Sequence, residues 1–160
     1  MKKRTQTLTR SATIAALYIV LTYVSNMAGL ASGAIQLRLS EALTVLPAFT
    51  FSAVPGLFVG CLISNILCGG MILDVIFGSL ATLLGALGTY YFRKNKYLVP
   101  IFPIISNTII IPFVLKFVYS FEGALWYFIV TVGIGEILSV GVLGVLLYNA
   151  LKKYNVLKEL

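Results

Sequence analysis

The residues best able to do chemistry in this 160-residue sequence are five carboxylates. Four lie in or beside long apolar runs and the fifth lies in the C-terminal tail: Glu41, Asp74, Glu122, Glu136 and Glu159. The sequence has no histidine and only two cysteines, so acid–base catalysis would rest on carboxylates alone and a zinc module is excluded. These residue types favour a binding site over an enzyme active site, with no cofactor and no metal ion.

Glu136 is the strongest functional candidate among the acids. No lysine or arginine lies within a helical turn of it, and Gly133, Gly135 and Gly141 around it allow other backbones to approach. A charged group near the centre of a bilayer costs about 2.5–3.5 kcal/mol on insertion scales, so a residue retained there is a functional candidate by default.

Structural interpretations compete with functional ones at the other polar positions. Arg38 and Glu41 are three residues apart and would share a helical face, so they either form an ion pair or contact a ligand. Asp74 near a helix start complements the positive end of the helix dipole. Asn107 is equally suited to bonding between helices.

The elements that must position these groups are membrane helices. Hydrophobic residues make up 59% of the chain and charged residues 11%, against about 25% charged residues in soluble domains. So few charges cannot cover a water-facing surface, which excludes an ordinary soluble domain and a disordered chain. The basic residues lie mainly at the chain ends and in one loop, which indicates membrane topology rather than nucleic-acid binding.

Charge-free runs of about 20 residues predict an all-α membrane protein with one six-helix domain over residues 1–160. The six expected spans cover residues 11–31, two helices within 35–73 that meet in a tight turn near residues 52–55, and residues 71–92, 98–117 and 123–151. The first helix of the pair within residues 35–73 is expected to be short and tilted or kinked.

Six spans place ten of the twelve basic residues on one side of the membrane: Lys2, Lys3, Arg4, Arg10, Arg93, Lys94, Lys96, Lys152, Lys153 and Lys158. The positive-inside rule then predicts that both termini are cytoplasmic. With this topology Glu136, Asn107, Asn65 and Asn26 lie between the midplane and the outer surface. They predict a solvent-filled pocket that is loaded from outside.

Small residues mark two surfaces where helices can approach closely. Ala12 and Ala16 form a small-xxx-small step on the first span, facing either a partner protein or a neighbour in the bundle. Gly56, Gly60 and Ser64 form a similar ridge, which predicts internal packing.

Three runs make the chain resemble a known family. They are residues 35–47 (IQLRLSEALTVLP), 55–61 (PGLFVGC) and 73–83 (LDVIFGSLATL). With six spans, both ends inside and A-x-x-x-A on the first helix, the chain resembles the substrate-binding (S) components of energy-coupling factor (ECF) transporters. Within that group it is similar to the QueT family, importers of queuosine precursors.

The resemblance implies a bacterial cytoplasmic-membrane protein that binds a deazapurine such as 7-aminomethyl-7-deazaguanine. It also implies partners: a transmembrane scaffold subunit, which Ala12 and Ala16 would face, and two subunits that hydrolyse ATP. Hydrolysis by these partners would topple the binder in the membrane and release its cargo inside the cell.

The candidate residues suit that ligand. A guanine-like edge offers two parallel donors to a carboxylate, and the cationic aminomethyl arm favours a second carboxylate. We expect Glu41 or Glu136, or both, to contact the substrate, Asn107 and Gln36 to meet the remaining polar groups of the ring, and Asp74 to be a third acid in reserve. An S component for another vitamin or nucleobase, or a small membrane enzyme or assembly factor, are the alternatives.

Overall fold

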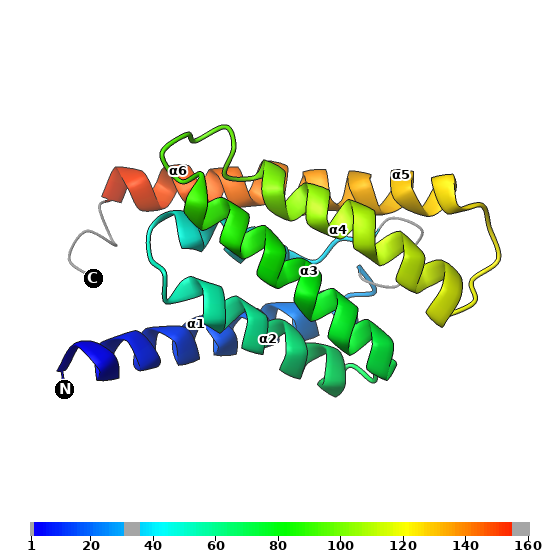
Figure 1. Ribbon diagram of the computed structural model, residues 1–160, viewed down its shortest axis with the longest axis horizontal. Coiled ribbons are helices and arrows are strands. Elements are labelled where there is room, and N and C mark those ends of the chain that lie inside the picture. Colours follow the sequence, from blue (N-terminus) through cyan, green and yellow to red (C-terminus); the bar gives the residue numbers. More distant parts are fainter. Residues whose placement is uncertain (1, 31–35, 155–160) are drawn as a thin grey trace.

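The computed structural model describes residues 2–30 and 36–154, and every regular element within these ranges is helical (Figure 1). In chain order the elements are α1 Lys2–Met27, the 3-10 helix η1 Leu39–Ala48, α2 Ala53–Leu67, α3 Ile72–Tyr91, α4 Ile101–Phe113, the π-helical segment η2 Val114–Val118, α5 Leu125–Glu136, the π-helical segment η3 Ile137–Gly144, and α6 Val145–Tyr154. The helices run along the long axis of the molecule, and α1 begins at the same end of that axis at which α6 ends.

Four of these helices are long and apolar enough to cross a membrane within the described ranges: Arg4–Met27, Ile72–Tyr91, Ile101–Val118 and Leu125–Tyr154. The last two are continuous rods in which α4 passes into η2, and α5 passes through η3 into α6. Pro112 lies just before η2 and lacks the N–H that a regular α-helix needs there, which favours the wider turns that follow.

The remaining two helices are shorter than a bilayer core. The 15 residues of α2 span roughly 22 Å and the 10 residues of η1 roughly 20 Å, against about 30 Å of hydrocarbon. The expected short second helix is therefore present, but as a tight 3-10 helix. Length and composition alone thus support four crossings.

Several boundaries differ from the sequence prediction. The first span was expected at residues 11–31, whereas α1 covers Lys2–Met27. The turn between η1 and α2 covers residues 49–52, and Pro55 lies in the first turn of α2, where a missing N–H costs no hydrogen bond. Residues 36–38 are extended, and Arg38 has φ −106° and ψ 107°, so the helix begins only at Leu39. Residue 35, where the second helix was expected to begin, lies outside the described part.

The 3-10 helix η1 is the central element of the bundle. It contacts α1, α2, α3, η3 and α6, and most of its residues are buried. On one side of the bundle, α1 packs directly on α2. A Cβ added at Gly56 would lie 2.7 Å from the Ser11 carbonyl oxygen, and one at Gly60 would lie 2.9 Å from Tyr18 Cβ. The glycine ridge is therefore an internal packing surface, as predicted.

Candidate functional site

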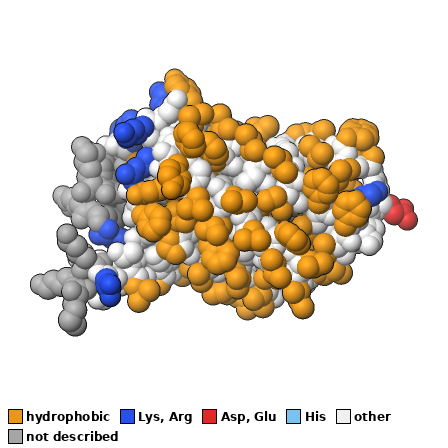
Figure 2. Space-filling view, viewed as in Figure 1, with side chains coloured by type: hydrophobic (Ala, Val, Ile, Leu, Met, Phe, Trp, Pro, Cys, Tyr) orange, Lys and Arg blue, Asp and Glu red, His pale blue; other side chains and the backbone are white. Residues whose placement is uncertain are grey.

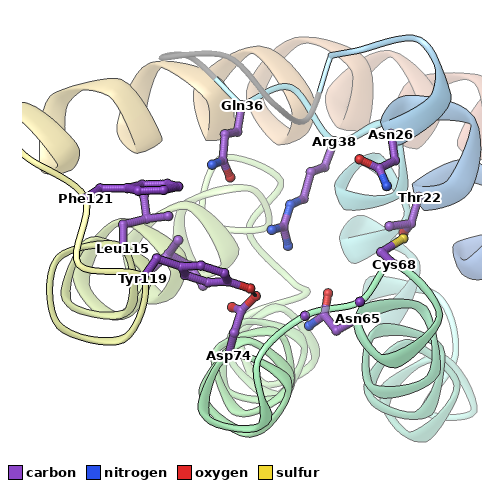
Figure 3. Close-up of a pocket in the computed structure, with 13 residues that line it drawn as sticks. Thr22, Asn26, Gln36, Arg38, Asn65, Cys68, Asp74, Leu115, Tyr119 and Phe121 are labelled. Carbon is purple, nitrogen blue, oxygen red and sulfur yellow. Dashed lines mark hydrogen bonds between the residues drawn. The ribbon is translucent and has the colours of Figure 1, made fainter.

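A polar cavity of about 340 Å³ opens at the end of the bundle opposite the chain termini. Asn26 of α1, Asn65 of α2 and Asp74 of α3 line it, and Gln36 and Arg38 reach it from the extended segment before η1. Figure 3 shows these side chains converging from different elements on one space. The volume is at the lower end of the range for small-molecule sites, and it suits a ligand about the size of one fused bicyclic ring.

Asp74 is the acid of this outer cavity. It occupies the first turn of α3, where its charge complements the helix dipole as predicted. The Tyr119 hydroxyl donates a hydrogen bond of 2.8 Å to Asp74 Oδ2 and accepts one of 3.2 Å from the Met71 backbone N–H. Asp74 Oδ1 therefore keeps its lone pairs for another donor, because no hydrogen bond to it occurs among the described residues.

A second, much smaller cavity of about 10 Å³ borders the first. Gln36, Arg38 and Ile111 line both spaces, so they separate the outer cavity from the inner one. Glu41 and Glu136 are the two acids of the inner cavity. Asn107, Gly78, Thr82 and Val132 complete its lining.

Glu41 is held by the protein itself. The Tyr18 hydroxyl of α1 donates a hydrogen bond to Glu41 Oε1, and Asn107 Nδ2 of α4 donates one of 3.4 Å to Oε2. Glu41 is 2% exposed and Tyr18 1% exposed. Both carboxylate oxygens thus have partners, which gives Glu41 a structural role in joining η1 to α1 and α4.

Glu136 differs from Glu41 in that one oxygen is unsatisfied. It is the last residue of α5, 8% exposed, and its Oε2 has no hydrogen-bond partner within the described part of the chain. A buried acceptor without a partner costs about 1–3 kcal/mol, so an unsatisfied group in a native structure requires an explanation. The π-helical segment η3 begins directly after Glu136, and π-helical turns are frequent at functional sites.

Gly135 has no side chain, which allows α5 to contact the backbone of the segment that carries Gln36 and Arg38. A Cβ added at Gly135 would overlap the backbone carbonyl oxygen of Gln36, so α5 lies in direct contact with this extended segment. On its other side, the Leu39 backbone N–H donates a hydrogen bond of 2.9 Å to Ser25 Oγ of α1. The segment is thus held between α5 and α1.

The comparison with known sequences decides the family. The sequence model described as "QueT transporter" matches residues 8–153, which is most of the chain. The chain belongs to the QueT transporter family. The resemblance of the sequence to the QueT family is thereby confirmed. The long apolar helices make the chain a multi-pass membrane protein.

One relative of this QueT-family chain is the "Queuosine precursor transporter QueT" of Lactococcus lactis subsp. cremoris (strain MG1363). The two are 35% identical over 96 residues, which is 59% of this chain. The match covers 56% of the length of that relative, or a little over half of it. No solved structure matches the chain.

All six predicted ligand-binding residues of this QueT-family chain line one of the two cavities. Arg38 and Gln36 line both cavities, Asp74 lines the outer one, and Glu41, Glu136 and Asn107 line the inner one. Their roles in binding remain predictions. Asp74 was expected to be a third acid in reserve, but the structure places it in the larger, outer cavity.

Of the two alternatives for Arg38 and Glu41, an ion pair or contact with a ligand, the ion pair does not occur in the part of the chain that the structure describes. The expectation assumed that both residues lie on one helical face. Arg38 instead precedes η1 in an extended conformation, and its side chain points into the outer cavity (Figure 3).

Several lining residues were not predicted as site residues: Thr22, Asn26, Asn65, Cys68, Tyr119 and Phe121. Asn26 and Asn65 were expected among the polar residues that predict the pocket but not among the ligand-binding residues, since depth does not reveal the direction of a side chain. Tyr119 follows the span Ile101–Val118, and an aromatic residue at a span end is usually a membrane-interface anchor. Its contact with Asp74, 45 positions earlier, is a product of the tertiary fold.

Proposed function

We propose that this protein is the substrate-binding component of an ATP-dependent ECF importer and captures a queuosine precursor of the deazapurine class. The observation that carries the proposal is the outer cavity of about 340 Å³, in which an acid, amides and a guanidinium converge between membrane helices. The name of the Lactococcus relative supports the ligand class.

The lining of the outer cavity suits the polar edge of a deazaguanine. The ring N1–H and the exocyclic amine are parallel donors, and a carboxylate such as that of Asp74 accepts such a pair in a charge-assisted, bidentate geometry. The ring carbonyl needs a donor, which the Arg38 guanidinium or the amides of Gln36, Asn26 and Asn65 can supply. The acid at this edge disfavours anionic cargo.

Six membrane crossings with both termini in the cytoplasm complete the proposal. Most of the basic side chains that Figure 2 shows gather at the end of the molecule where α1 begins and α6 ends, and apolar side chains cover its middle. The described basic residues at the chain ends and in the loop after α3 are Arg4, Arg10, Arg93, Lys94, Lys96, Lys152 and Lys153. By the positive-inside rule this end faces the cytoplasm of a bacterial cell, and the cavity opens outward.

The exposed face of α1 is the docking site proposed for the transmembrane scaffold subunit, to which two ATP-hydrolysing subunits bind. Ala12 and Ala16 are exposed, whereas Ala15 beside them is buried against α2. Ala12 also lines an apolar groove of about 550 Å³ between α1 and α2. Small residues on such a face allow the backbone of a partner helix to approach closely.

We expect Ala12→Leu combined with Ala16→Leu to abolish co-purification with a coexpressed ECF module, because the added side chains keep the partner helix at a distance. Ligand binding by the isolated double variant should remain at the wild-type level. Leu17→Phe is the matched control, because it enlarges an exposed side chain about 100° from Ala16 and about 140° from Ala12 around the same helix. Retention of the module by the double variant would exclude this face as the contact.

Calorimetry on the detergent-purified protein tests the ligand assignment. We expect saturable 1:1 binding of 7-aminomethyl-7-deazaguanine, with competition by guanine but not by adenine, because adenine lacks the N1–H and 2-amino donor pair. Competition by adenine as strong as that by guanine would indicate a different nucleobase class. The absence of binding by every purine and deazapurine would overturn the proposed function.

A further inference from the structure

The inner cavity has the size of a single small polar group. Its volume of about 10 Å³ accommodates roughly one water-sized group, whereas the outer cavity is about 340 Å³. The two share Gln36 and Arg38 in their lining, so a ligand ring in the outer cavity would have the inner one beside it. A short substituent on such a ring would therefore extend into the inner cavity.

Glu136 supplies an open acceptor at this place. Its Oε2 is buried without a hydrogen-bond partner in the described ranges, whereas both oxygens of Glu41 are engaged by Tyr18 and Asn107. An N–H donor that enters the inner cavity would thus find an unpaired oxygen on Glu136 and none on Glu41. It would satisfy the acceptor that the empty protein leaves unpaired.

The charges around the two cavities favour a cationic donor. Among the described lining residues, the acids are Asp74, Glu41 and Glu136, and Arg38 is the one basic side chain. Excess negative charge in a space enclosed by membrane helices is unfavourable unless a cation balances it. A neutral substituent would leave this imbalance in place, and an ammonium group would reduce it.

We propose that the inner cavity is an ammonium subsite, with Glu136 as its acceptor and Arg38 as the cation present before the ligand arrives. The ligand would be a flat heteroaromatic ring carrying a primary aminomethyl group, with the ring in the outer cavity and the amine beside Glu136. This inference rests on the proposed function and adds to it the part of the site that selects an amine over an uncharged substituent.

The test compares two ligands that differ only in this arm, 7-aminomethyl-7-deazaguanine and 7-cyano-7-deazaguanine. For the wild-type protein we expect the amine to bind at least 10-fold more tightly than the nitrile. In Glu136→Gln, which keeps the shape but removes the charge, the ratio of the two dissociation constants should fall to about one, with nitrile affinity changed less than threefold. Ser139→Ala alters a buried hydroxyl one turn further along, outside both linings, and should keep the wild-type ratio.

A second variant keeps the test decisive if Glu136→Gln does not fold. Arg38→Gln removes the competing cation. The dissociation constant of the nitrile divided by that of the amine should therefore rise at least threefold, whatever happens to overall affinity. The ammonium subsite would be overturned if the two ligands bind the wild-type protein with nearly equal dissociation constants. It would also be overturned if the ratio of these constants is unchanged in Glu136→Gln or in Arg38→Gln. If the wild-type protein binds neither ligand, the proposed function itself fails.

Discussion

Asp74→Asn is expected to lower the affinity for a guanine-like ligand about 100-fold, which corresponds to about 2.8 kcal/mol. The loss arises because the carboxylate accepts two parallel donors at once, whereas an amide offers one acceptor and places its own NH₂ group against a donor. The structure supports the assignment because Oδ2 accepts one hydrogen bond, from Tyr119, and Oδ1 accepts none among the described residues, so each oxygen keeps a lone pair for a ligand donor. Calorimetry on the purified variant measures the change.

Two controls separate this effect from loss of structure. Tyr119→Phe keeps the carboxylate and removes only one hydrogen bond to it, so affinity should fall less than 10-fold. Glu122→Gln removes an exposed carboxylate outside both cavities and should leave affinity unchanged. Wild-type affinity in a folded Asp74→Asn protein would show that the ring edge does not bind at Asp74.

Gly135→Ala is expected to produce the largest effect among the glycine positions. The added Cβ would overlap the Gln36 carbonyl oxygen, well inside the 3.0 Å that real Cβ atoms essentially never cross. The segment 36–38 must then move away from α5, and it carries two of the side chains that line both cavities. We expect ligand affinity to fall at least 10-fold and unfolding to be easier by about 1–3 kcal/mol, as for other overpacked sites.

Gly133→Ala is the matched control on the same helix. A Cβ at Gly133 would lie 3.4 Å from Thr108 Cγ2, which is an ordinary contact. Thermal unfolding in detergent and ligand titration of the two variants should therefore differ clearly. Equal behaviour of the two alanine variants would show that the contact between α5 and the segment 36–38 does not position the site.

Some helix boundaries could be predicted from the helix breakers and charges that flank the apolar runs. The span predicted at residues 71–92 agrees with α3 Ile72–Tyr91 to within one residue at each end. The glycine ridge on α2 was equally predictable, since small residues four apart indicate close packing whatever the partner. Local signals of these kinds do not depend on how the helices are arranged.

The detailed geometry of the site could not be predicted in the same way. A helical period placed Arg38 and Glu41 on one face, but residues 36–38 are extended because they are held between Gly135 and Ser25. The different roles of Glu41 and Glu136 likewise depend on Tyr18 and Asn107, which come from other helices. Sequence could predict that these acids are buried, but not which of their oxygens already has a donor.

The bonds around Glu41 have a mechanical consequence. Asn107 of α4, Glu41 of η1 and Tyr18 of α1 form a continuous chain of hydrogen bonds across the bundle. Any shift of α4 or η1 on filling the cavities is therefore transmitted to α1, whose outer face carries Ala12 and Ala16. If that face docks the scaffold subunit, loaded and empty molecules would differ in the surface they present, and the importer would gain a means of sensing whether its carrier holds cargo.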